Sequence, residues 1–367
     1  MSTRRTLICA IASALLAVGG AGRAQTPGKV YRIGWLSSGP WAGTQPVEVF
    51  NQGMRELGWV EGRHYMVDNR YTEGRSERIA AHAADLVQRK VDLLVGSGTP
   101  HTTALKNATA TIPILFYYVG DPVGSGLVAS LARPGGNVTG LGGLGSGGSA
   151  KQLELLREMV PKASRIATLF NPAVSFHAAI AAEVEPAARS LGVTLRPIEL
   201  RSPDDIDAAF ATLAREPVDA LLIFNQGFLF QHGARVAKLA IEQRLPAIIS
   251  FQEVARYGVL MSYGSNILDD ARRVPYFVDR VLKGAKPAEL PVEQPSRFYL
   301  TINQKTAKAL GLTIPQSVLL RALPGPKPSA QANADRWPQA RRTQRHGRTN
   351  IDVIRKCRNV CSRRWLD

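Results

Sequence analysis

The sequence is poor in cysteine, with three in 367 residues, at Cys9, Cys357 and Cys361. None lies between residues 10 and 356. This long central part therefore holds neither a disulfide framework nor a thiolate metal site, and it would tolerate an oxidising compartment without mispairing. A small scaffold stapled by disulfides is excluded.

Signals of metal binding and of nucleophilic catalysis are also scarce. The six histidines are scattered, with no pair at helical or turn spacing, and the sequence contains no G-x-S-x-G motif. Only His101 and His177 fall just after predicted strands, where a side chain can contact a ligand. We therefore expect neither a metal ion nor a cofactor.

Long hydrophobic runs are missing as well. The apolar run from Leu7 to Val18 has twelve residues, too few to span a bilayer. It follows two arginines and precedes the small residues of positions 22–24, which is the order of a secretory signal. We predict a signal peptide over residues 1–24 and a periplasmic location. A buried N-terminal helix is the alternative, but the Thr-Pro-Gly sequence at 26–28 breaks the chain before any strand.

Acidic residues are few, and 46 Lys and Arg against 29 Asp and Glu give a formal net charge of +17. Residues 323–367 carry eleven of these bases against three acids, and they follow a proline-rich break without helical or strand periodicity. We predict a disordered basic tail there. The body is only mildly basic, so no nucleic-acid partner is expected; nucleic-acid binding through the tail is an alternative function.

Short apolar stretches alternate with amphipathic stretches along the chain, which predicts parallel strands joined by right-handed crossovers. In the first half, strands are predicted at 30–36, 65–71, 91–96, 112–118 and 138–141, and helices at 47–57, 77–88, 102–108 and 124–131. After a glycine-rich stretch, strands are predicted at 165–170, 194–200, 220–224, 247–249 and 259–262, and helices at 150–159, 178–191, 204–213, 234–243 and 269–282. A short helix is predicted at 303–310.

Two similar α/β lobes, each with a parallel sheet, are the economical interpretation of this doubled pattern. We predict lobe 1 over residues 25–140, with a C-terminal return near 267–300. Lobe 2 is predicted over residues 141–266, with 300–322 packing on the body.

The loops that follow the predicted strands are rich in neutral hydrogen-bonding and aromatic side chains. Open α/β sheets bind ligands outside the carboxyl ends of their strands, so these residues are the candidate ligand contacts. They are Ser37, Ser38, Thr99, Pro100, Tyr118, Asp121, Asn171, Ser175, Asn225, Gln226, Phe251, Gln252 and Tyr263. Helix N-caps are the alternative role for the small polar ones.

Aromatic side chains on both lobes predict a sandwich around a planar or apolar ligand. Tyr118 would supply the ring of the first lobe, and Tyr263 or Phe251 the ring of the second. Successive residues of a strand point to opposite faces, so only one of Tyr117 and Tyr118 is expected to face the cleft.

The glycine-rich stretch 140–145 satisfies G-x-G-x-x-G between a strand and a helix. It lies in the fifth strand–helix unit rather than the first, and no acid ends the next strand to hold a ribose, so a flexible crossover fits equally well. The alternative function is a two-lobed enzyme, dinucleotide-using or racemase-like, with Asp121 and Glu253 as acid and base. Asp121 fits better as the cap of a helix beginning at Pro122.

Two neighbouring motifs, DPVGSGLV at 121–128 and RPGGNVTG at 133–140, strongly resemble the solute-binding proteins of ABC importers, a family whose members include tryptophan binders. Further similar segments lie at 53–62, 151–156, 283–291 and 303–315, so the resemblance covers about residues 31–320. It implies a periplasmic-binding-protein type I-like fold, with two Rossmann-like lobes and a ligand cleft between them.

The same resemblance implies a function as a binder and not as an enzyme. The protein is expected to capture a small organic solute, of amino-acid or aromatic type, by hinge closure and to deliver it to an ABC permease and its ATPase. It is expected to act as a monomer. The strand-end loop at Asn225 and Gln226 differs from that of the tryptophan-binding members, so tryptophan itself is not carried over.

Overall fold

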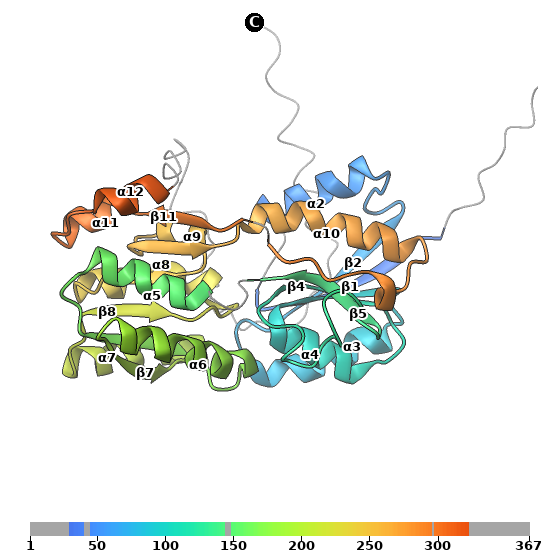
Figure 1. Ribbon diagram of the computed structural model, residues 1–367. Helices are drawn as coiled ribbons and strands as arrows, with labels where there is room; N and C mark the ends of the chain where they lie inside the picture. The colour runs from blue at the N-terminus through green and yellow to red at the C-terminus, as the bar shows by residue number, and fades with distance from the viewer. Residues whose placement is uncertain (1–28, 40–44, 144–147, 296, 323–367) are drawn as a thin grey trace, which may run out of the picture. The chain divides into compact units, whose positions relative to one another are not determined.

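The computed structural model describes residues 29–39, 45–143, 148–295 and 297–322, and every structural statement below concerns these ranges. The strands form two sheets, and we call each sheet with the helices that cover it a lobe (Figure 1). The first lobe has a parallel sheet in the order β2-β1-β3-β4-β5. Its strands are β1 (Tyr31–Ser37), β2 (Tyr65–Tyr71), β3 (Leu93–Ser97), β4 (Ile114–Val119) and β5 (Val138–Gly142).

The second lobe has a sheet in the order β11-β10-β9-β8-β6-β7. Its neighbouring strands pair in parallel except for β11, which runs antiparallel to β10 at the edge. The strands are β6 (Arg165–Phe170), β7 (Thr194–Glu199), β8 (Ala220–Ile223), β9 (Ala247–Ile249), β10 (Met261–Gly264) and β11 (Tyr299–Ile302). Two parallel-sheet lobes confirm the predicted fold class.

Helices connect the strands in both lobes. Those of the first half are α2 (Gln45–Glu56), α3 (Ile79–Gln88) and α4 (Gly98–Ala108). Those between β5 and β10 are α5 (Gly148–Met159), α6 (Ser175–Ser190), α7 (Ile206–Arg215), α8 (Leu229–Glu242) and α9 (Gln252–Arg256). The last three are α10 (Ile267–Leu282), α11 (Gln304–Ala309) and α12 (Gln316–Arg321). Single 3-10 turns lie at η1 (Ser76–Arg78), η2 (Pro203–Asp205) and η3 (Pro287–Glu289).

The two sheets share one strand order. In each, the second strand of the lobe lies at the edge, beside the first, and the third, fourth and fifth follow on the other side. The chain therefore turns in opposite directions after β1 and β3, and again after β6 and β8. A crevice opens outside the carboxyl ends of strands at such switch points, so the topology places one candidate binding edge on each lobe.

Helix α10 follows β10 of the second lobe in sequence but packs on the first lobe. Val274 and Phe277 of α10 share a buried core with Trp35 of β1 and Leu93 of β3. Figure 1 shows α10 beside α2, and a Cβ added at Gly53 of α2 would lie 2.9 Å from Pro275 Cγ of α10. The chain thus passes between the lobes after β5, after β10 and before β11, which ties the two lobes together at three crossings.

One predicted helix, at 124–131, is wrong. Gly124 N donates to Asp121 Oδ1 at 2.7 Å, and Gly126 has a φ of +69°. Asp121 therefore caps a local turn and not a helix. The left-handed backbone of Gly126, two residues after Gly124, reverses the chain before a helix can continue. Strand β11 and helices α9 and α12 were not predicted; each is six residues or shorter, below the length at which a periodicity becomes visible.

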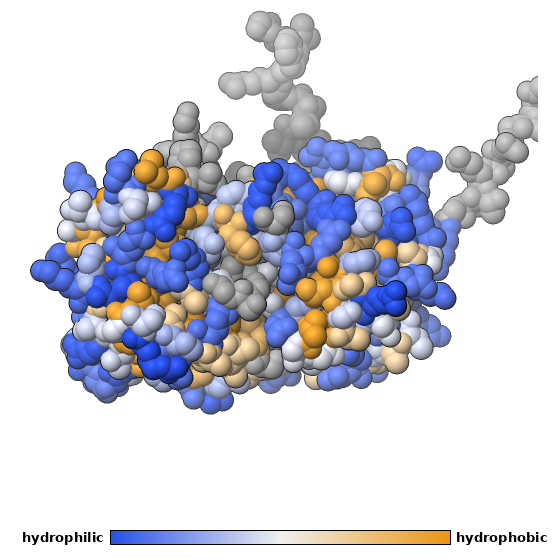
Figure 2. All heavy atoms as spheres, viewed as in Figure 1, coloured by the Kyte–Doolittle hydropathy of each residue, from blue (hydrophilic) through white to orange (hydrophobic). Residues whose placement is uncertain are grey.

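The surface view in Figure 2 is mostly hydrophilic, with apolar residues in scattered patches, as is usual for a folded domain. Within the described ranges, no helix combines the length and the apolar character that crossing a membrane requires.

The packing of α10 on the first lobe can be tested with Phe277→Ala. Phe277 is 2% exposed, so its truncation leaves a cavity and should lower the free energy of unfolding by about 3–5 kcal/mol. Urea unfolding, followed by circular dichroism, measures the change. The control Tyr257→Ala removes a ring that is 48% exposed and should cost less than about 1 kcal/mol. Equal losses in the two variants would contradict this packing.

Candidate functional site

A cavity of about 160 Å³ lies where the switch points of the two lobes meet. Residues after β1 and β3 line it from the first lobe, and residues after β6 and β8 line it from the second. Many of the predicted ligand contacts are among its walls. These are Ser37, Ser38, Thr99, Pro100, Tyr118, Asn171, Asn225, Gln226 and Phe251.

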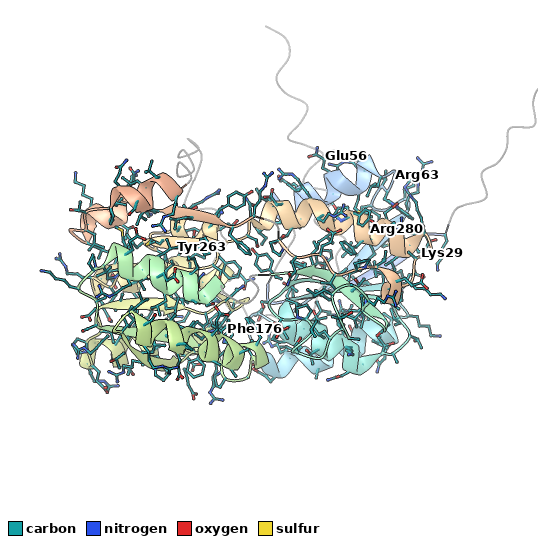
Figure 3. All side chains as sticks on the ribbon, in the orientation of Figure 1. Lys29, Glu56, Arg63, Phe176, Tyr263 and Arg280 are labelled. Carbon is teal, nitrogen blue, oxygen red and sulfur yellow. The ribbon has the colours of Figure 1, made fainter. Side chains whose placement is uncertain are left out.

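Asp121, Gln252 and Tyr263 were also predicted as contacts and do not line this cavity. The carboxylate of Asp121 is engaged with Gly124 N, and Gln252 begins α9. Tyr263 packs against Phe298, with ring centroids 5.9 Å apart, and Figure 3 shows it well apart from the cavity residue Phe176. Ser175 begins α6, but its side chain is outside the described part of the structure.

Buried polar side chains of the cavity wall, those of Thr99 and Gln226 among them, have no hydrogen-bond partner within the described ranges. On Thr99, which is 2% exposed, the unpaired atom is Oγ1. On Gln226, which is 4% exposed, both amide atoms are unpaired. An unpaired buried polar group costs about 1–3 kcal/mol, so a hydrogen bond from a bound molecule would stabilise the protein at these positions.

Three helices begin at the cavity without a side-chain cap. Ser97, Val174 and Phe228 are the N-cap residues of α4, α6 and α8, and none of their side chains accepts a hydrogen bond from the helix that follows. All three residues line the cavity. Helix N-termini carry partial positive charge, so these three helix starts favour an anionic group in the cavity.

Tyr118 disturbs the alternation of β4. Its φ is +63°, a left-handed conformation that is strained for a bulky residue, and the β4–β5 register shifts between Phe116 and Val119. Because of this bulge, Tyr117 and Tyr118 both line the cavity. The expectation that only one of them faces the cleft is therefore wrong. Backbone strain of this kind is common at binding sites.

The aromatic rings of the two lobes touch each other. The centroids of Tyr118 and Phe251 lie 5.6 Å apart, with 39° between the ring planes. The predicted sandwich, with a ligand between these two rings, is therefore not open in this conformation. The rings instead form one apolar wall of the cavity. Burial raises the pKa of Tyr118 well above its usual value, so its hydroxyl is neutral.

His177 joins the two strand-end loops of the second lobe. Asn171 N donates to His177 Nδ1 at 2.9 Å, and His177 Nε2 lies 2.9 Å from Asn225 O, to which it donates. This pattern requires the neutral ring, and burial lowers the pKa of His177 to about 4. His177 is thus a positioning residue for Asn171 and Asn225, both of which line the cavity.

His101 plays a similar part in the first lobe. Its Nδ1 lies 2.6 Å from Ser97 O, to which it donates, and its Nε2 lies 3.2 Å from Thr72 Oγ1. Burial lowers the pKa of His101 to about 4, so it lines the cavity as a neutral ring. Thr72 also lines the cavity and was missed by sequence reasoning, although its place directly after β2 is the signal that selected the other contacts.

The two lobes make close contacts around the cavity. Arg75 Nη1 lies 3.2 Å from Asp204 Oδ2. A Cβ added at Gly227, after β8, would lie 2.3 Å from Ser38 Oγ, after β1. Glycine at 227 therefore permits a backbone approach between the lobes that a side chain would obstruct.

Charge is scarce in the walls. Arg201 is the one charged side chain among the described lining residues, and its guanidinium is paired with Glu199 at 2.6 Å. In the same part of the chain, no group of three or more His, Cys, Asp or Glu could hold a metal ion. These features are those of a two-lobed ligand-binding protein. The switch points of two α/β lobes face one cavity, and its wall holds unpaired polar groups.

Comparison with known proteins identifies the family. Residues 42–324 match the family model described as ABC transporter substrate binding protein. The chain therefore belongs to the family of ABC transporter substrate-binding proteins, which confirms the resemblance of its motifs. This is a family of binding proteins and not of enzymes.

Individual relatives are similar over most of the chain. A tyrosine-binding protein of Clostridioides difficile (strain R20291) is 26% identical over 263 residues, 72% of this chain and 75% of the relative. The structure of an ABC domain from Streptococcus pneumoniae in complex with L-Trp is 27% identical, with a TM-score of 0.71, over 80% of this chain and 99% of the other. A conserved domain protein of Vibrio cholerae gives the same identity and coverage with a TM-score of 0.73. The fold is the periplasmic-binding-protein type I fold.

The role of His177 predicts a specific pH dependence of stability. In the unfolded chain this ring binds a proton with a pKa near 6.5, whereas in the folded protein the pKa of His177 is about 4. His177 therefore lowers stability as the pH falls from 6.5 to 4. Asp270 acts in the opposite direction over the same window, because burial raises its pKa to about 7. The contribution of His177 is therefore measured as the difference in Tm between a His177 variant and the parent protein.

His177→Gln should lower Tm at pH 6.5, where its hydrogen bonds are lost, and this deficit relative to the parent should shrink at pH 4. Thermal unfolding at the two pH values measures it. His82→Gln, on α3, is the control and should follow the parent at both. A deficit that stays constant with pH would contradict a buried, neutral His177.

Proposed function

We propose that this protein captures a small organic solute, of amino-acid or aromatic type, in the cavity between its lobes. The observation that carries the proposal is the set of buried, unpartnered polar groups on Thr99 and Gln226, two residues that line a cavity walled by aromatic rings. Small-molecule sites combine mostly apolar walls with a few placed polar groups in this way. The ligands named for two relatives, tyrosine and L-Trp, support a solute with a planar part.

Capture is proposed to work through hinge closure. A solute that contacts both lobes stabilises the arrangement in which they are together, because it binds that arrangement better than a separated one. The three crossings of the chain provide the hinge, and Gly227 and Ser38 meet on closing. The closed form is then the one that an ABC permease, with its ATPase, would recognise.

The cellular setting is part of the proposal. Residues 1–24 have the order of a secretory signal, and they lie outside the described residues, as does the basic segment 323–367. We place the mature protein in the periplasm as a monomer. Of the alternatives, the enzyme is excluded by the family, and no observation on the described residues favours nucleic-acid binding.

A ligand screen tests this proposal. Aromatic amino acids, aromatic carboxylates and aromatic amides are added to the purified protein, and Tm is recorded. A solute at a hundredfold excess over its Kd should raise stability by about 2.7 kcal/mol. Asn225→Ala should weaken a stabilising compound at least about tenfold, and the control Asn107→Ala, on exposed α4 surface, should leave it unchanged. A panel without any stabilising compound, or chemical turnover of one, would argue against solute capture.

Closure can be tested separately with Gly227→Val. The added side chain must displace Ser38, so the lobes cannot approach fully, and the affinity for the stabilising compound should fall at least about tenfold, roughly 1.4 kcal/mol. Calorimetric titration measures the affinity. Gly136→Val is the matched control, because a Cβ at Gly136 meets no atom within 4 Å. Equal affinities in the two variants would show that binding does not need this contact.

A further inference from the structure

We propose that the solute is an organic carboxylate with a planar or apolar body and no ammonium group. This inference rests on the proposed function and narrows it from amino acids and aromatic compounds to one class. It depends on which charges the cavity can accept.

The carboxylate end is matched by the uncapped helices. The first turns of α4 and α8 line the cavity, and these helices are 11 and 14 residues long, so each has a developed dipole. Each of these helix starts has an unpartnered donor. Thr99 Oγ1 lies in the first turn of α4, and Gln226 Nε2 lies three residues before the start of α8. Neutral donors at helix N-termini bind an anionic oxygen without a full counter-charge.

An ammonium group has no carboxylate counterpart among the described lining residues, and the unpartnered acceptor Gln226 Oε1 is neutral. None of the described lining residues is Asp or Glu. A buried ammonium without a carboxylate costs several kcal/mol, and helix N-termini repel it. Gln226 offers a neutral amide to the cavity in place of a charge.

Carboxyl groups on segments next to the lining residues do not supply a cation partner either. Asp121 accepts from Gly124 N, and Glu199 pairs with Arg201. Glu253 and Asp270 lie close enough to Tyr118 to raise its pKa, but neither lines the cavity. Burial also raises the pKa of both carboxyl groups, which weakens them as partners for a cation at neutral pH.

The test compares acids that differ only by the α-ammonium group. The pairs are 3-(indol-3-yl)propanoate with L-tryptophan, 3-(4-hydroxyphenyl)propanoate with L-tyrosine and 3-phenylpropanoate with L-phenylalanine. Calorimetric titration of the full chain gives each Kd. In at least one pair the deaminated acid should bind at least about tenfold more tightly than the amino acid. An amino acid that binds as tightly as its acid, or more tightly, in every pair would overturn the proposal.

A second experiment introduces a negative charge at Gln226. Gln226→Glu places a carboxylate in the cavity wall, so the affinity for the deaminated acid should fall at least about tenfold and the preference should shift toward the amino acid. Gln88→Glu, on the exposed end of α3, makes the same change of charge away from the cavity and should preserve the parent's preference. A Gln226→Glu variant that keeps the parent's preference would overturn the role of this cavity in selecting charge.

The outcomes separate this inference from the proposed function. Binding of amino acids alone overturns the class of solute but leaves solute capture standing. Binding of neither member of any pair overturns the class, and the wider screen of aromatic amides then decides solute capture. Thr99→Val removes one donor with little change of shape, and it should weaken the acid more than a neutral amide of the same body. Equal losses for the two compounds would contradict a carboxylate at this position.

Discussion

Parallel strand pairing is the constraint on which the rest of the molecule depends. It sends the carboxyl ends of the strands in each sheet to one edge, and it requires a crossover helix that begins at the same edge. The shared strand order then opens a crevice after β1 and β3 in one lobe and after β6 and β8 in the other. Because the two crevices line one cavity, the start of α4 in the first lobe and the start of α8 in the second face the same small volume.

Several local departures from the usual rules meet at this volume. Helices α4, α6 and α8 begin there without a side-chain cap, as do α3, α7 and α12 elsewhere, whereas α11 has an Asn303 cap. Tyr118 holds a strained backbone, and buried amide atoms of Gln226 have no partner within the described ranges. Tyr118 and Gln226 both line the cavity, and each departure lowers stability. Such costs are expected where function, and not folding, sets the residue.

Much of this arrangement follows from local sequence. Strands β2, β6 and β9 were predicted at their observed bounds, because apolar stretches bounded by polar turns determine them. The loops after β1, β3, β6 and β8 were selected by the same rule and do line the cavity. The helix predicted at 124–131 failed because a left-handed Gly126 overrides the pattern around it.

Other features depend on contacts that no local pattern records. A bulge at Tyr118 brings two adjacent tyrosines to one cavity, against the alternation of a regular strand. Tyr263 follows the rule for a strand end, yet it packs on Phe298 instead of facing the cavity. The missing partners of Gln226 become visible only when the whole surroundings of its amide are known. Local sequence therefore predicted the edge at which the cavity lies, and tertiary contacts decided which residues line it.

The most direct test of this account is a crystal structure of the protein with 3-(4-hydroxyphenyl)propanoate. The account predicts the compound between the lobes, with its carboxylate within hydrogen-bond distance of Thr99 Oγ1 and Gln226 Nε2 and its ring against Tyr118. A compound bound elsewhere on the surface, or bound in this cavity with its carboxylate directed away from α4 and α8, would contradict it.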